Sequence, residues 1–264
     1  MTTAPDLIRF KAEGRRFAVL TAYDYPTAVI LDRAEIPVLL VGDSVANTVL
    51  GYPTTLQVTL EEMVQHCRAV SRGSRNALLV GDLPFGTYEA SPEQALVSAA
   101  RLLREGGVHA VKLEGGLSQI QTVRRLTQAG IPVMGHLGLT PQSVHQFGGY
   151  KVQGRDAKSQ AEILEGAGEL EAAGAFSIVL EAVPAPLAES VTRALRIPTI
   201  GIGAGPACDG QVLVLHDMLG IPERVPRFVK RYGELGSEIE RLARQYASEV
   251  ADGTFPGPEH SYPK

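Results

Sequence analysis

The chain has 264 residues, a formal net charge of −4 and 44% hydrophobic residues, a composition typical of a soluble protein that buries a full core. The slightly acidic balance excludes the basic face of a typical nucleic-acid-binding protein. No apolar run reaches the roughly 18 residues that span a bilayer, and the N-terminus lacks the apolar core of a secretory signal. We therefore expect a cytoplasmic protein that binds neither nucleic acid nor membrane, with Cys67 and Cys208 as buried free thiols.

Short apolar runs recur along the chain, each followed by a turn with glycine or an acidic residue and then by an amphipathic segment. Most of these runs are continuously apolar, as in parallel strands that are covered on both faces. We take them as strands of one domain that spans residues 1–264. The predicted strands are residues 17–22, 38–42, 77–81, 110–114, 132–136, 177–181, 198–203 and 212–215.

Helix signals lie between these runs. Capping boxes begin at Thr59 and at Ser91, and the second is followed by proline at the first helical position. Three glycines are expected to end helices in the left-handed conformation: Gly106, Gly130 and Gly174.

Eight strands that alternate with helices predict a (β/α)8 barrel. The alternative is an open doubly wound sheet, which would carry a glycine-rich nucleotide turn after its first strand. The first predicted strand has no such turn. The glycine-rich segment 201–205 follows the seventh strand instead, and Pro206 breaks the dinucleotide-binding pattern.

Two segments fall outside the repeating unit. Residues 137–156 form a long irregular segment after the fifth strand, which we interpret as a loop that closes over bound substrates. Residues 225–251 read as an amphipathic helical region, clearest between Phe228 and Val250. We expect it to pack on the barrel or on a neighbouring subunit, and the tail after Ala251 to be mobile.

Charged side chains end most of the predicted strands. Because the C-terminal ends of barrel strands meet at the active-site face, these side chains are expected to converge there. Asp43 could by itself cap the following helix, and so could Asp82. Capping does not account for a carboxylate at four equivalent positions. The converging residues are Asp43, Asp82, Lys112, Glu114, His136 and Glu181.

Clustered carboxylates repel one another unless a cation holds them ionised. Oxygen ligands, with no cysteine or paired-histidine spacing, indicate a hard cation such as Mg²⁺. Lys112 lies two residues from Glu114 on one strand face, where it would bind an anionic substrate or pair with Glu114 or Asp82. His136 is either a catalytic group or a supporting hydrogen-bonded residue. Ser44, which lacks the nucleophile-elbow pattern, is expected to bind substrate.

Longer sequence motifs surround these positions, from Leu20 to about Gly220. They are LTAYDYPTA, VGDSVANTVLGYPTT, LLVGDLPFGTYE, VKLEGG, PVMGHLGLTPQSVHQFGGYKVQGR, VLEAVP and IPTIGIGAG. In these motifs the chain resembles the ketopantoate hydroxymethyltransferase family. The resemblance implies a phosphoenolpyruvate/pyruvate-type barrel that binds Mg²⁺. It also implies hydroxymethyl transfer from 5,10-methylenetetrahydrofolate to 3-methyl-2-oxobutanoate in pantothenate biosynthesis.

The resemblance also implies roles for single residues. Asp43, Asp82 and Glu114 match the metal site of the family. Ser44 and Lys112 match residues that hold the oxo acid, together with the two aspartates. Glu181 matches the proposed proton acceptor. The family further implies a homo-oligomer, commonly a decamer.

The general base is expected to be Glu181, which lies across the barrel mouth from the two aspartates. The apolar residues that follow it should raise its pKa towards the working range, and His136 is the next candidate. Two other functions remain open. One is a Mg²⁺-dependent 2-oxo acid lyase or mutase that needs no folate, and the other is a small-molecule binding protein on a barrel scaffold.

Overall fold

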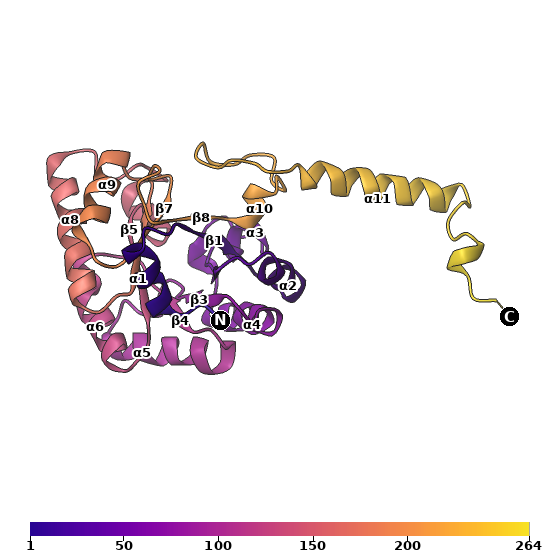
Figure 1. Cartoon of the computed structure of the whole chain (residues 1–264). Coiled ribbons are helices and arrows are strands. Elements are labelled where there is room, and N and C mark those ends of the chain that lie inside the picture. The colour runs from indigo at the N-terminus through magenta and orange to yellow at the C-terminus, as the bar shows by residue number, and fades with distance from the viewer. Residues whose placement is uncertain (264) are drawn as a thin grey trace. The chain divides into compact units, whose positions relative to one another are not determined.

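The computed structural model describes residues 1–263 and contains two compact units, Met1–Leu213 and a second that begins at Val214. The first unit is a closed barrel of eight parallel strands that pair in chain order (Figure 1). This confirms the predicted (β/α)8 fold. The strands are β1 (Phe17–Thr21), β2 (Val38–Val41), β3 (Leu78–Asp82), β4 (Ala110–Lys112), β5 (Val133–Gly138), β6 (Ser177–Glu181), β7 (Thr199–Ile202) and β8 (Gly210–Leu213).

A main helix follows each of the first six strands, whereas β7 connects to β8 without one. Shorter helical turns lie in the loops after β2, β4 and β5. The main helices are α2 (Tyr25–Arg33), α4 (Leu60–Gly73), α5 (Pro92–Arg101), α6 (Ile120–Gln128), α8 (Ala157–Ala172) and α9 (Ala185–Ala194). The shorter ones are α3 (Val45–Thr48), η1 (Thr55–Gln57), η3 (Leu117–Gln119), η4 (Pro141–Ser143) and α7 (Val144–Phe147).

Both predicted helix starts are confirmed. Thr59 forms the predicted capping box, whereas the side chain of Gln94 accepts from the backbone of Ala90 and not from that of Ser91. Thr59 and Ser91 both cap their helices, and each side chain accepts a hydrogen bond from the backbone three residues on. Gly130 and Gly174 adopt positive φ as predicted, but the prediction for Gly106 is wrong. The last turn after α5 widens into the π-helical segment η2 (Leu102–Gly106), which shifts the left-handed residue to Gly107.

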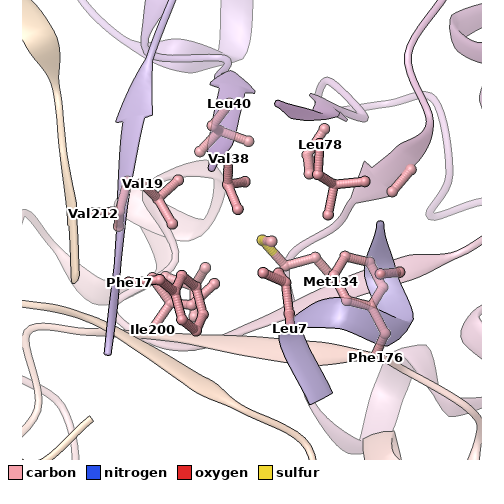
Figure 2. Packing of buried hydrophobic residues seen from close by; sticks show 14 of the residues in the cluster. Leu7, Phe17, Val19, Val38, Leu40, Leu78, Met134, Phe176, Ile200 and Val212 are labelled. Carbon is pink, nitrogen blue, oxygen red and sulfur yellow. The ribbon is translucent and has the colours of Figure 1, made fainter. Parts of the chain in front are cut away.

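The barrel interior is apolar towards the end where the strands begin (Figure 2). Alternate residues of each strand point inward, as the two-residue repeat of a strand requires. Helix α1 (Ala4–Ala12) adds Leu7 and Phe10 to this cluster, and the ring of Phe10 lies 6.1 Å from that of Phe17. The barrel interior is therefore a packed core at the end where the strands begin.

The same alternation directs polar side chains inward at the other end. Val80 belongs to the apolar cluster, so Asp82, two residues on, shares its face. Ala110 is likewise followed by Lys112, and Val179 by Glu181. Short strands thus run from apolar core to charged site within three residues.

The second unit contains α10 (Leu215–Met218), α11 (Leu235–Ala251) and η5 (Pro258–His260). The predicted start of the long helix, at residues 225–228, is wrong, because Pro226 and Gly233 interrupt helical structure before Leu235. Within the described residues no helix is long and apolar enough to cross a membrane. Helix α11 exposes a row of large apolar side chains at helical spacing: Leu235, Ile239, Leu242, Tyr246 and Val250.

Gly138, at the end of β5, is tied to the chain segment that carries Glu181. Its φ is 90°, and a β-carbon at this position would clash with the carbonyl oxygen of Glu181 and with Val183. The carbonyl oxygen of Glu181 also accepts a hydrogen bond from the amide of Leu139 at 2.8 Å. Close backbone approach here depends on glycine.

We predict that Gly138→Ala lowers the free energy of unfolding by about 3 kcal/mol or more, since left-handed strain and overpacking add together. Gly130→Ala is the matched control, because Gly130 has a φ of 82° but open space around its Cα. It should cost only about 1–2 kcal/mol of strain. Equal losses for the two variants in urea unfolding would contradict the proposed close approach.

We also predict that the apolar row of α11 is covered in a homo-oligomer. Ile239→Glu and Leu242→Glu should each reduce the assembled mass measured by sedimentation. Ser237→Glu, on the opposite face of the helix, should leave it unchanged. A wild-type protein that sediments as a monomer at micromolar concentration would refute this prediction.

Candidate active site

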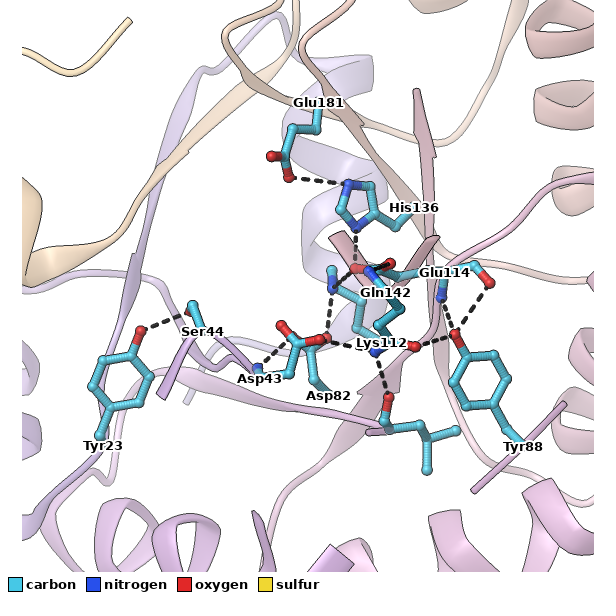
Figure 3. Close-up of polar contacts among 11 residues, drawn as sticks. Tyr23, Asp43, Ser44, Asp82, Tyr88, Lys112, Glu114, His136, Gln142 and Glu181 are labelled. Carbon is cyan, nitrogen blue, oxygen red and sulfur yellow. Dashed lines mark hydrogen bonds and ion pairs between the residues drawn. The ribbon is translucent and has the colours of Figure 1, made fainter. Parts of the chain in front are cut away.

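Asp43, Asp82 and Lys112 form one buried group at the C-terminal ends of β2, β3 and β4 (Figure 3). The backbone amide of Asp43 donates to Oδ2 of Asp82 at 2.9 Å. The ammonium of Lys112 donates to Oδ1 of Asp82 at 2.6 Å. Asp82 and Lys112 are directly paired residues of neighbouring strands, which explains their contact.

Burial and, next to it, the nearby carboxylates of Asp82 and Glu114 together raise the pKa of Asp43 to about 8. Burial would lower the pKa of Lys112, but the Asp82, Glu114 and Asp43 carboxylates outweigh it and raise the pKa. Lys112 therefore remains an ammonium ion, and the group around it has more carboxylates than it can neutralise.

Asp43, Asp82 and Lys112 make up the first row of the site. Glu114, His136 and Glu181 form a second row beside it. Nδ1 of His136 lies 3.3 Å from Oε1 of Glu114, and Nε2 lies 3.3 Å from Oε2 of Glu181. Among the described residues neither nitrogen has a hydrogen-bond partner of good geometry, so these contacts are ion pairs. Lys112 joins the two rows, since its ammonium lies 3.9 Å from Oε1 of Glu114.

The two carboxylates control the charge of the imidazole. Burial, and next the Lys112 ammonium, would lower the pKa of His136, but the adjoining carboxylates raise it to about 9. Burial would raise the pKa of Glu114, but His136 and then Lys112 lower it. At neutral pH His136 is therefore an imidazolium beside the Glu114 carboxylate.

Glu181 differs from the other carboxylates in its access to solvent. Its side chain is 15% exposed, whereas those of Asp82 and Glu114 are 3% exposed. The next residue, Ala182, has a φ of 46°, a conformation that costs a non-glycine residue energy and that the surrounding structure must hold. Its amide donates to the carbonyl of Ile202 at 2.9 Å, which fixes the chain just after Glu181.

Ser44 lies one residue after Asp43, at the start of α3. Its hydroxyl is 2.8 Å from that of the buried Tyr23, and burial raises the pKa of Tyr23. A β-carbon placed on Gly42 would lie 2.8 Å from the Ser44 hydroxyl and 3.5 Å from Oδ2 of Asp82, so the Ser44 side chain lies near the aspartates.

Two further residues, Gln142 and Tyr88, belong to the site but were missed from the sequence. The amide of Gln142 donates to Oδ2 of Asp43 at 2.9 Å, and its backbone N–H donates to Oε2 of Glu114 at 3.0 Å. The hydroxyl of Tyr88 donates to the amide oxygen of Gln142 at 2.6 Å. Both residues are uncharged and lie in loops, so a search for charges at strand ends does not find them.

The oxygen donors of Asp43 and Asp82 fit a hard cation. In the described part of the chain, no three histidine, cysteine, aspartate or glutamate side chains lie close enough together to hold a metal ion. Mg²⁺ commonly binds one or two carboxylates and completes its shell with water and substrate. The buried Asp43 and Asp82 meet this need. Asp82 is also paired with Lys112, and Glu114 lies beside both Lys112 and His136.

All seven predicted site residues therefore lie at one mouth of the barrel. Contacts link Asp43, Asp82, Lys112, Glu114, His136 and Glu181 in one connected network, and Ser44 borders it. The expected alternative for Lys112, pairing with Asp82 and Glu114, is present. The roles of these residues in metal binding and catalysis stay predictions.

Solved structures share the fold. Phosphoenolpyruvate phosphomutase from Streptomyces platensis subsp. rosaceus has a TM-score of 0.64 with 15% identity, covering 98% of this chain and 92% of that one. A 2,3-dimethylmalate lyase, described as a member of the PEP mutase/isocitrate lyase superfamily, has a TM-score of 0.60 with 17% identity, covering 100% of this chain and 93% of the lyase. At these identities the likeness supports the barrel fold alone.

Sequence relatives are much more similar. The 3-methyl-2-oxobutanoate hydroxymethyltransferase of Oleidesulfovibrio alaskensis is 59% identical over 98% of this chain and 90% of its own. That of Heliobacterium modesticaldum is 55% identical over 98% of this chain and 95% of its own. The sequence model of the ketopantoate hydroxymethyltransferase family matches residues 1–258. Matches that cover nearly the whole chain at such identity show that it belongs to the ketopantoate hydroxymethyltransferase family.

Proposed function

We propose that the barrel mouth transfers a hydroxymethyl group from 5,10-methylenetetrahydrofolate to 3-methyl-2-oxobutanoate, giving 2-dehydropantoate. Membership of the family confirms the predicted 3-methyl-2-oxobutanoate hydroxymethyltransferase activity in pantothenate biosynthesis. The observation that carries the mechanism is the pair of rows in the site. An aspartate pair, of which Asp82 is bonded to Lys112, lies beside a histidine between two carboxyl groups.

In this proposal Asp43 and Asp82 would hold Mg²⁺, with Glu114 as the third carboxylate of the site. When bound, Mg²⁺ acts as a Lewis acid that draws electron density from the carboxylate and oxo group of the substrate. The buried carboxyl groups outnumber the one ammonium, which supports a divalent cation here. A bound cation would relieve the repulsion between these carboxylates, which is stronger because they are buried.

Lys112 and Ser44 orient the oxo acid. One N–H of Lys112 is used by Asp82, and an ammonium has three, so others remain for a substrate oxygen. The hydroxyl of Ser44 borders the aspartates and can donate to the substrate carboxylate. Because Lys112 is buried and charged, it attracts the anionic substrate strongly.

Glu181 is the proposed base. It removes the proton from C3 of the oxo acid, and the electron pair of the C–H bond moves towards the oxo oxygen. C3 then bonds to the folate-borne carbon as one of its two bonds to folate nitrogen breaks. Water breaks the second carbon–nitrogen bond and supplies the hydroxyl, and the protons from C3 and from water end on the two folate nitrogens. Two observations support Glu181 over His136: its side chain is the more exposed, and both nitrogens of His136 face carboxylates.

His136 is assigned the task of holding the two glutamates. Its ring fixes the position of Glu181 through Nε2 and that of Glu114 through Nδ1. Proton transfer requires a base within hydrogen-bond reach of the proton, so a small displacement of Glu181 costs rate. The imidazolium thus contributes to catalysis through the groups it positions.

The first prediction from this mechanism tests the cation and the folate together. 2-Dehydropantoate should form only when oxo acid, methylenetetrahydrofolate and Mg²⁺ are all present. Asp82→Asn or Asp43→Asn should lower turnover by about 10²-fold or more, the size expected for lost Lewis-acid stabilisation.

Asp24→Asn is the matched control, because Asp24 follows β1 but caps α2, a task that asparagine also performs. It should retain near wild-type turnover. Full activity of Asp82→Asn in chelator-treated buffer would contradict the cation site. Cleavage of the oxo acid without folate would support a lyase instead.

A second prediction separates proton removal from carbon transfer. In D₂O with Mg²⁺ and no folate, the wild type should exchange the C3 proton of 3-methyl-2-oxobutanoate. Glu181→Gln should still bind the oxo acid but exchange about 10²-fold or more slowly, the usual size of general-base catalysis. Glu189→Gln, on the surface of α9, is the control. Exchange at the wild-type rate in Glu181→Gln would assign the base elsewhere, first to His136.

A further inference from the structure

Gln142 bonds more groups of the site than any single aspartate does. It lies in η4, in the loop between β5 and α8, and is 6% exposed. Its side-chain amide donates to Oδ2 of Asp43 at 2.9 Å and to the carbonyl of Leu83 at 3.0 Å. Its backbone N–H donates to Oε2 of Glu114 at 3.0 Å. A loop residue thus bonds two carboxylates of the proposed site at once.

The orientation of this amide is fixed by its neighbours. Both N–H bonds of the amide are used, and its oxygen accepts from the hydroxyl of Tyr88 at 2.6 Å. A flipped amide would place its oxygen against the carboxylate of Asp43 and the carbonyl of Leu83, two acceptors that cannot donate. Tyr88 is 2% exposed and its hydroxyl also accepts from the backbone of Glu114 at 3.3 Å, so it cannot turn away freely.

An amide suits this position because it donates without carrying charge. A lysine here would compete with a cation for Asp43, and a glutamate would add to the negative charge already present. Within the described residues, Oδ2 of Asp43 accepts the hydrogen bond from Gln142, and Oδ1 accepts none. The Asp43 carboxylate is therefore held through Oδ2, and Oδ1 remains free to bind a cation.

We infer that Gln142, fixed by the hydroxyl of Tyr88, is a positioning residue that orients the Asp43 carboxylate for a divalent cation. The inference rests on the cation site of the proposed function and adds two uncharged residues to it. It also fastens the first turn of the loop after β5 to that site. Tyr88 reaches Asp43 only through Gln142, so the effects of the two residues on the Asp43 carboxylate should not add.

The test measures the dissociation constant of Mn²⁺ by electron paramagnetic resonance in the full chain, without substrates. Gln142→Met keeps the length of the side chain but removes the amide, and should weaken Mn²⁺ binding about 10- to 100-fold, as changes behind a metal ligand usually do. Tyr88→Phe should weaken it less, by several-fold. The double variant should bind as Gln142→Met does, because the hydroxyl then has no amide to orient.

Gln153→Met is the matched control. Gln153 lies in the same loop, but its amide donates to the carbonyl of Lys151 and contacts no site carboxylate. Its Mn²⁺ affinity should equal that of the wild type. Circular dichroism and thermal melting check that each variant is folded. Should Gln142→Met fail to fold, Tyr88→Phe alone decides, because it removes a single oxygen: unchanged affinity overturns the inference.

Three other results overturn the inference. Wild-type affinity in folded Gln142→Met does so, and so do additive effects of the two substitutions, which would show that Tyr88 acts separately. Mn²⁺ binding by Asp43→Asn shows whether the inference or the proposed cation site has failed. If it abolishes Mn²⁺ binding while Gln142→Met does not, the inference fails alone. If Asp43→Asn has no effect, the proposed cation site fails and the inference fails with it.

Discussion

The Lys112 ammonium and the Asp82 carboxylate, 2.6 Å apart at the buried end of two neighbouring strands, hold the site together. A buried ion pair is tolerated only when its remaining hydrogen-bonding capacity is also used. Asp82 meets this condition by accepting the backbone amide of Asp43, which sets the place of the next carboxylate. Lys112 also lies near Glu114. Glu114 contacts His136, which in turn contacts Glu181. Changes to this pair therefore reach every proposed role.

The apolar half of the barrel makes such a concentration of charge possible. Side chains from all eight strands and from α1 fill the interior below the site. Burial of that apolar surface supplies the stabilisation against which several buried charges are set. Because the strands are short and parallel, inward positions change from apolar to charged within one repeat. The core therefore serves as the rigid floor of the site.

The loops contribute precision that the strands cannot. Strand ends place carboxylates side by side, but neither the rotation of a carboxylate nor the solvation of a glutamate follows from that. Gln142 and Tyr88, which come from the loops after β5 and β3, hold the rotation of the Asp43 carboxylate. The strained Ala182 and the close approach of Gly138 hold the backbone at Glu181. A site built on rigid strands is thus adjusted by a few loop residues.

Periodicity and strand-end chemistry in the sequence determined the barrel, all eight strands within a few residues, and the convergence of Asp43, Asp82, Lys112, Glu114, His136 and Glu181. These features depend on local patterns, because alternation along a strand fixes which side chains point inward. The tertiary structure decided the rest. It moved a helix cap from Gly106 to Gly107, started the last helix at Leu235, and placed Glu114 beside both His136 and Lys112. It also brought in Gln142 and Tyr88, because contacts between loops far apart in the chain depend on packing that no local pattern encodes.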